Sequence, residues 1–100
     1  MSRVVRSRAA ERDFIEIWNY IAADDSQAAD KLLFKLEDQA NFLADFPKSG
    51  SPRPELGRDA RSFVIGNYLI IYRPIADGIR LLRILNASRD VSRAMRRRKP

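Results

Sequence analysis

The hydrophobic residues of this chain change their spacing once, near residue 61, and this change restricts the fold more than any other feature. Before residue 61, apolar residues recur every three or four positions, which is typical of amphipathic helices. After it they recur at every second position or in short continuous runs, which is typical of strands. A chain of 100 residues has room for one modest core, so both halves must share it. The sequence therefore predicts a single α+β domain over residues 1–100.

Two amphipathic helices are expected in the first half. The first follows Ser7, a suitable N-cap, and ends near Ala23. Its apolar positions are Phe14, Ile17, Trp18 and Ile21. The second helix follows the capping residues 24–26 and ends at Phe46, because Pro47 disfavours helical geometry in the residue before it. The link between the two is so short that we expect an antiparallel helical hairpin.

Four strands are expected around these helices. They span residues 3–7, 62–65, 68–74 and 79–85. Tight turns at Gly66-Asn67 and Asp77-Gly78 join the last three into an antiparallel meander. The order is therefore β-α-α-β-β-β, with the first strand free to join the meander. Because the later strands are apolar on both faces, we expect central strands with one face under the helices.

Residues 47–60 separate the helical half from the strands. This segment holds three of the five prolines and two of the four glycines, which is typical of an ordered loop or surface crossing rather than of a helix or strand. A loop of this length is either functional or a connection that carries the chain to the far edge of the sheet. The sequence leaves both interpretations open.

The chain has no cysteine and no histidine, which removes several classes of chemistry. Disulfides, thiolate metal sites, zinc sites with histidine ligands and the Ser-His-Asp triad are all excluded. No metal or cofactor is therefore expected. No apolar run approaches the roughly 18 residues of a membrane span, and residues 1–8 lack the apolar stretch of a secretory signal. We expect a cytoplasmic protein that does not enter the membrane.

The formal charge of +6 is unevenly distributed. Residues 1–8 carry +3, residues 9–60 carry −5, residues 61–79 carry +1 and residues 80–100 carry +7. Fifteen of the nineteen basic residues are arginines, which suit planar, bidentate contacts with phosphate or carboxylate. An acidic helical hairpin between Arg-rich ends favours docking to a specific partner over general DNA binding. Residues 89–100 are expected to begin as a short helix.

Four short motifs follow one another over about residues 3–95. They are a Ser-Ala-Asp pattern from Ser7 to Asp13 leading to Ile-x-x-Tyr-Ile at 17–21, Phe-Pro-x-x-Gly with Arg-Pro-Glu-Leu at 46–56, Gly-Asn-Tyr-x-Ile-x-Tyr-Arg at 66–73, and Ile-Leu-x-x-x-Arg-Asp at 84–90. In this order and spacing they resemble the ParE/RelE superfamily of toxins from bacterial type II toxin–antitoxin modules, and more closely its ParE, or plasmid-stabilisation, branch. ParE-like toxins usually have histidine where this chain has Asn86.

The resemblance implies different activities for the two branches. RelE-like members are ribosome-dependent mRNA endonucleases, whereas ParE-like members poison DNA gyrase and have no catalytic site. The position after Tyr68, basic in RelE-like nucleases, is Leu69 here, and their C-terminal tyrosine falls near Met95. Neither side chain can transfer a proton. The three tyrosines, at positions 20, 68 and 72, are expected in the core or at an interface. The ParE-like reading is therefore favoured, with a RelE-like endonuclease or a simple nucleic-acid-binding module as alternatives.

The candidate functional residues form two groups. The expected target-binding residues are Arg61, Arg73, Arg83, Arg89 and Arg93. Arg73 and Arg83 interrupt apolar strands, where a charge is costly unless it faces solvent, an acidic partner or a phosphate. A salt bridge to Asp59, Asp77 or Asp90 is the structural alternative.

A cognate ParD-like antitoxin is implied as a partner, in a hetero-oligomer with the toxin. Its segment that folds on the toxin is expected to be acidic and to bring apolar anchors. The expected docking residues are Phe14, Trp18, Ile21, Phe34 and Phe42. A role in the core is the alternative for Phe14 and for Trp18.

Overall fold

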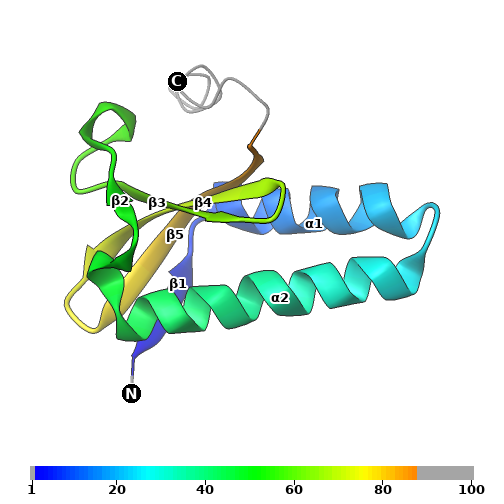
Figure 1. Ribbon diagram of the computed structural model, residues 1–100, viewed down its shortest axis with the longest axis horizontal. Coiled ribbons are helices and arrows are strands. Elements are labelled where there is room, and N and C mark those ends of the chain that lie inside the picture. Colours follow the sequence, from blue (N-terminus) through cyan, green and yellow to red (C-terminus); the bar gives the residue numbers. More distant parts are fainter. Residues whose placement is uncertain (1, 88–100) are drawn as a thin grey trace.

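The computed structural model describes residues 2–87 and has the predicted α+β order (Figure 1). Its elements are β1 (Arg3–Arg6), α1 (Arg8–Ala22), α2 (Ser26–Asp45), the 3₁₀ turn η1 (Pro47–Ser49), β2 (Ser51–Pro52), the 3₁₀ turn η2 (Pro54–Leu56), β3 (Arg61–Ile65), β4 (Tyr68–Ile75) and β5 (Gly78–Asn86). Ser7 caps α1 and Asp25 caps α2, as the sequence predicts. The helix expected within residues 89–100 lies outside the described residues.

The strands form one mixed sheet in the order β1-β5-β4-β3-β2. β1 joins the meander as expected and runs parallel to β5, whereas all other neighbours are antiparallel. Figure 1 shows α1 and α2 side by side, with the turn between them pointing away from the sheet. The short strand β2 was not expected. β2 is only two residues long, and both pair with β3, so it is too short to give a periodic signal in residues 47–60.

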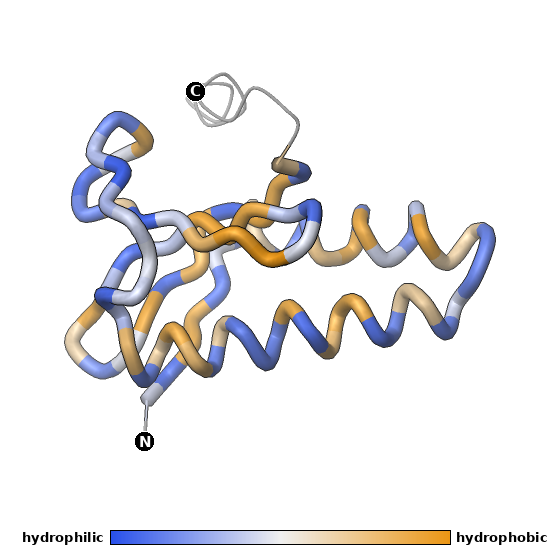
Figure 2. The backbone as a smooth tube through the Cα atoms, in the orientation of Figure 1, coloured by the Kyte–Doolittle hydropathy of each residue, from blue (hydrophilic) through white to orange (hydrophobic). Residues whose placement is uncertain are grey.

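The main core lies between the helical hairpin and one face of the sheet. Its buried residues are Ala10, Phe14, Leu36, Ala40, Leu43, Ala44, Ile70, Tyr72, Ile79, Leu81 and Ile84. Figure 2 shows hydrophobic residues concentrated along the strands and alternating with hydrophilic ones along the helices. A smaller cluster on the other face contains Leu56, Ala60, Leu69, Ile71 and Leu85. The two faces of the sheet each carry buried side chains, which explains why the strands are apolar on both faces.

Ser7 joins the first strand, the first helix and β5. Its backbone N–H donates to the carbonyl of Leu81, which is the last residue of β5 in register with β1. Its hydroxyl accepts the N–H of Ala10 in the first turn of α1 and donates to the carbonyl of Leu82, both at 3.0 Å. The side chain of Ser7 thus continues the hydrogen bonding of β5 past the end of β1 while it caps the helix.

Asp13, further along α1, makes the next contacts with this edge of β5. Its carboxylate accepts the backbone N–H of Ile84 at 2.9 Å and two N–H groups of Arg83 at 2.7 and 3.1 Å. The Asp13 and Arg83 side chains are only 8% and 16% exposed. The Ser-Ala-Asp pattern therefore fixes α1 against a strand some seventy residues later in the chain.

Tyr72 holds the start of the loop that follows α2. Its hydroxyl donates to the carbonyl of Pro47 at 2.7 Å and accepts the N–H of Gly50 at 2.9 Å. A Cβ at Gly50 would lie 2.5 Å from this hydroxyl and 2.8 Å from the carbonyl oxygen of Ser62. Position 50 must therefore be glycine for the chain to pass this close to β3 and β4.

Because the hydroxyl of Tyr72 is buried, we expect the protein to lose stability at alkaline pH. Burial raises the pKa of Tyr72 above its ordinary value of 10.0, although the Gly50 N–H and the charge of Arg61 oppose the shift. A raised pKa means that the folded state prefers the neutral phenol, so the stabilisation is complete below pH 10.0 and is lost as the pH rises through the folded pKa.

Urea unfolding of the native protein and of Tyr72→Phe measures this effect. At neutral pH we expect the variant to be less stable by about 1–3 kcal/mol, because the buried Gly50 N–H loses its acceptor. The difference should narrow above about pH 10. Tyr20→Phe is the matched control, since its ring is 82% exposed. A stability gap between Tyr72→Phe and the native protein that stays constant with pH would contradict this account.

Candidate functional site

Arg73 of β4 and Arg80 of β5 lie directly opposite each other in the sheet. Arg73 is exposed and Arg80 is half-buried. Within residues 2–87, neither side chain makes a hydrogen bond or ion pair. Like charges at opposed positions of neighbouring strands destabilise a sheet. This Arg73–Arg80 pair therefore presents two uncompensated positive charges, which favours an anionic partner.

The other arginines of the strands are neutralised or anchored within the described chain. The ion pairs are Arg3–Asp77, Arg6–Glu37 and Arg83–Asp13, with N–O distances of 3.0, 2.6 and 2.7 Å. The guanidinium of Arg6 also lies 4.1 Å from the ring centroid of Phe14. Arg61 donates to the carbonyls of Lys48 and Gly50 at 3.3 and 2.6 Å. The contrast separates the Arg73–Arg80 pair from the arginines that stabilise the fold.

The structure divides the arginines predicted to bind the target. Arg73 occupies an exposed position suited to binding. Arg83 is not available for binding in the same way, because it forms an ion pair with Asp13. Asp13 was not among the salt-bridge partners predicted from the sequence, since this pairing depends on how α1 crosses β5. Arg61 anchors the loop after α2 through its Nη1. Arg89 and Arg93 lie outside the described residues.

Arg80 is not among the binding residues predicted from the sequence, although the chain does contain a signal for it. The β4–β5 hairpin turns at residues 76–77, with Ile75 opposite Gly78. Counting back from this turn places Arg73 opposite Arg80, so the hairpin register alone pairs the two charges. The β-bulge at Ile71/Tyr72 lies beyond this pair and leaves the count undisturbed.

A second surface is formed by large apolar side chains along the second helix and the residue after it. Phe34, Phe42 and Phe46 are 71%, 43% and 58% exposed. The ring of Phe42 lies 5.2 Å from that of Phe46 and 6.5 Å from that of Phe63 on β3. Phe34 makes neither of these ring contacts and lies exposed earlier on the same helix. Exposed aromatic side chains of this kind are typical of a protein-binding surface. We call Phe34, Phe42 and Phe46 the α2 aromatic surface.

The residues predicted to dock the antitoxin are therefore not all accessible. Phe34 and Phe42 belong to the α2 aromatic surface, whereas Phe14 is 3% exposed and is a core residue. Trp18 and Ile21 are half-buried, and the indole N–H of Trp18 donates to Asp30 of α2 at 2.9 Å. Trp18 thus joins the two helices of the hairpin. Its contacts support a role in the fold rather than in docking the antitoxin.

The three tyrosines also differ in how far they are buried. Tyr72 is fully buried and Tyr68 packs against the main core, as expected. Tyr20 is 82% exposed and is not a core residue. It lines a hollow of about 330 Å³ between α1 and the ends of β4 and β5, together with Tyr68 and Asn86. The position that is usually histidine in ParE-like toxins therefore lies at the rim of an open groove.

Two features that would indicate a catalytic site are missing from residues 2–87: a group of metal ligands and a basic side chain at position 69. Within the described residues, no three carboxylates lie close enough together to hold a metal ion. Leu69, at the position that is basic in RelE-like nucleases, is 6% exposed and belongs to the smaller hydrophobic cluster. Nor does any helix of the described chain combine the length and apolar character needed to cross a membrane.

Comparison with known proteins identifies the family. The family model described as the ParE toxin of the type II toxin–antitoxin system parDE matches residues 4–91. Toxin ParE3 of Caulobacter vibrioides is 25% identical over 93 residues, which cover 92% of this chain and 93% of that toxin. A solved structure, the chromosomal ParDE TA system from P. aeruginosa, has a TM-score of 0.72 at 21% identity, covering 88% of this chain and 98% of that chain, and so shares the fold. This chain belongs to the ParE toxin family of type II toxin–antitoxin systems.

Proposed function

We propose that this toxin acts by binding DNA gyrase and trapping the enzyme on cleaved DNA, with no catalytic residue of its own. The observation that carries the proposal is the Arg73–Arg80 pair, which has no carboxylate partner within residues 2–87. Two uncompensated positive charges on neighbouring strands, one exposed and one half-buried, suit a phosphate or an acidic surface of a macromolecular target. The toxin acts in the cytoplasm, where gyrase is found.

Two polar side chains of this region that could transfer a proton are already engaged in holding the fold. Tyr72, the neighbour of Arg73 in β4, is buried on the opposite face and uses its hydroxyl to hold the loop after α2. Asp13 uses its carboxylate on Arg83 and Ile84. General acid–base catalysis needs a group free to move a proton and typically contributes about 10²–10⁴-fold to a rate. A nuclease that relied on the Arg73–Arg80 pair alone would therefore be slow.

An acidic ParD-like antitoxin neutralises the toxin in this proposal, within a hetero-oligomer. The α2 aromatic surface offers apolar anchors, and the Arg-rich strands attract the acidic segment electrostatically. Phe34 is the most exposed of the three aromatic residues and is the first candidate for an anchor.

Inducible expression with and without the antitoxin tests the proposed target. Expression of the toxin alone should arrest growth, induce the DNA damage response and produce gyrase–DNA adducts while mRNA stays intact. Co-expression of the antitoxin should suppress all three effects. Cleavage of mRNA in translating ribosomes without gyrase–DNA adducts would overturn the proposal and favour the RelE-like endonuclease.

The Phe34→Ser variant tests the docking surface. Because its ring is 71% exposed, we expect the fold to be kept and the antitoxin to bind about 10- to 100-fold more weakly, as for an aromatic hot spot. Calorimetric titration of the toxin with the antitoxin measures this change. Val64→Ser, which removes an apolar side chain 62% exposed on β3, is the matched control. Equal affinities of the two variants would exclude Phe34 as an anchor.

A further inference from the structure

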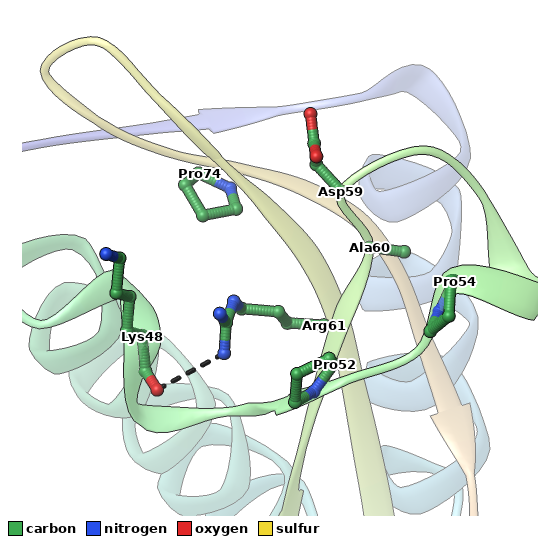
Figure 3. Close-up of a pocket in the computed structure, with 7 residues that line it drawn as sticks. All are labelled: Lys48, Pro52, Pro54, Asp59, Ala60, Arg61 and Pro74. Carbon is green, nitrogen blue, oxygen red and sulfur yellow. Dashed lines mark hydrogen bonds between the residues drawn. The ribbon is translucent and has the colours of Figure 1, made fainter.

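A hollow of about 420 Å³ lies between the loop after α2 and the unpaired end of β4 (Figure 3). β3 begins at Arg61, opposite Tyr72, so the last three residues of β4 have no partner strand on this side. The loop curves around the gap that remains. The lining residues are Lys48, Pro52, Pro54, Asp59, Ala60, Arg61 and Pro74. Lys48 and Pro74 also line a neighbouring hollow that contains Phe46, so this site adjoins the α2 aromatic surface.

Arg61 presents a fixed hydrogen-bonding edge to this hollow. Its Nη1 donates to the carbonyls of Lys48 and Gly50, which holds the guanidinium in place. Its Nε and Nη2 have no hydrogen-bond partner among the described residues. These two nitrogens form the side of a guanidinium that binds two oxygens of a phosphate or carboxylate at once. Because the group is already fixed, an anion would bind with little loss of side-chain entropy.

Lys48 brings a second positive charge to the same hollow. Figure 3 shows its side chain rising beside Arg61 toward Pro74. The ammonium makes no ion pair or hydrogen bond with any part of the chain between residues 2 and 87. Asp59 lies across the hollow, and in Figure 3 its carboxylate is turned away from Arg61. The two cations are therefore not neutralised by the one acidic residue that lines the site.

The walls between these charges are apolar and rigid. Pro52, Pro54 and Pro74 have fixed φ angles and no N–H group, and Ala60 is buried. Apolar walls lower the local dielectric constant and so strengthen the interaction of the two cations with an anion. The volume lies within the range of small-molecule sites, about 300–1,000 Å³. The hollow has room for a phosphate group with a sugar attached.

We propose that this hollow binds a terminal phosphate group, that is, a phosphate monoester. The paired charges of Lys48 and Arg61 match a dianion, which a phosphate monoester approaches at neutral pH. A phosphodiester or a carboxylate carries a single charge and would leave one cation uncompensated. The phosphate can belong to a free nucleotide or to the 5′ end of a nucleic acid strand. This proposal does not depend on gyrase as the target.

Titration with inorganic phosphate at constant ionic strength, followed by amide NMR shifts, is the first test. The shifts should saturate and should be centred on Lys48, Ala60 and Arg61. Acetate, a monoanion, should bind at least about tenfold more weakly because it matches only one of the two charges. Equal binding of acetate, or no saturation up to about 20 mM phosphate, where a site with a dissociation constant of about 1 mM would be nearly filled, would overturn the proposal.

Two lysine variants locate the site. Lys48→Gln should keep the fold, because the described chain uses only its carbonyl, and should bind phosphate at least about tenfold more weakly. Lys35→Gln makes the same charge change at an exposed position of α2 and should bind as the native protein does. If both variants bind phosphate equally, the hollow is not the site.

Two further ligands identify the source of the phosphate. Tighter binding of AMP than of inorganic phosphate would support a free nucleotide. Tighter binding of a 5′-phosphorylated DNA oligonucleotide than of the same oligonucleotide with a 5′-hydroxyl, with no gain for AMP, would support a strand end. In both cases Lys48→Gln should remove the preference, and a preference that survives this substitution would overturn the proposed site. Toxicity is not a readout here, so the result is independent of the proposed function.

Discussion

Asp13→Ala is expected to lower the free energy of unfolding by about 3–5 kcal/mol, because it removes the carboxylate that pairs with Arg83 in a partly buried site. It also leaves the buried N–H of Ile84 without an acceptor. A domain of this kind is stabilised by only about 5–15 kcal/mol in total, so the variant should lose a substantial part of its stability. Urea unfolding followed by circular dichroism measures the loss.

Three comparisons separate the parts of this effect. Asp13→Asn keeps an acceptor for Ile84 but not the charge that Arg83 needs, and it should be intermediate in stability. The double variant Asp13→Ala, Arg83→Met removes both charges of this ion pair and should recover part of the loss. Asp38→Ala removes an exposed carboxylate of α2 and should change stability by less than about 0.5 kcal/mol. If Asp13→Ala is no more harmful than Asp38→Ala, the contact between α1 and β5 does not stabilise the fold as described.

The same contact shows why the sequence predicts the elements of this fold better than their connections. Ser7 as a helix cap and Pro47 as a helix stop act on their immediate neighbours, so their effects can be inferred from the chain alone. Asp13 acts on a residue 71 positions away, and no periodicity indicates this. The hydroxyl of Tyr72 likewise meets Pro47 only once the loop and sheet are assembled.

The sequence likewise predicts only some of the candidate site residues. An arginine that interrupts an apolar strand is either exposed or paired, and the sequence alone does not decide which. Arg73 is exposed, whereas Arg83 is paired with Asp13. The difference arises because Asp13 of α1 reaches β5 at Arg83, where β1 has already ended. The aromatic residues of α2 could be proposed as a surface because they lie off its main stripe, but Phe14 shows that an aromatic residue within the stripe belongs to the core.

The Arg73→Glu variant is expected to lose toxicity and to gain stability at the same time. In the sheet, glutamate at position 73 would face Arg80 and replace a repulsive pair by an attractive one, raising the free energy of unfolding by up to about 1 kcal/mol. At the target, the same change would turn an attraction into a repulsion, and we expect binding to gyrase to fall by more than about 100-fold.

These opposite directions distinguish a binding role from a structural one. If Arg73 served only the fold, toxicity and stability would change together, as they should for Asp13→Ala. Arg12→Glu makes the same charge reversal at an exposed position of α1 and controls for the change in net charge. Growth arrest in cells, pull-down of gyrase and thermal unfolding of the purified variants give the three readouts. Full toxicity of Arg73→Glu, or an equal loss in Arg12→Glu, would show that the uncompensated charge of the Arg73–Arg80 pair is not what the target recognises.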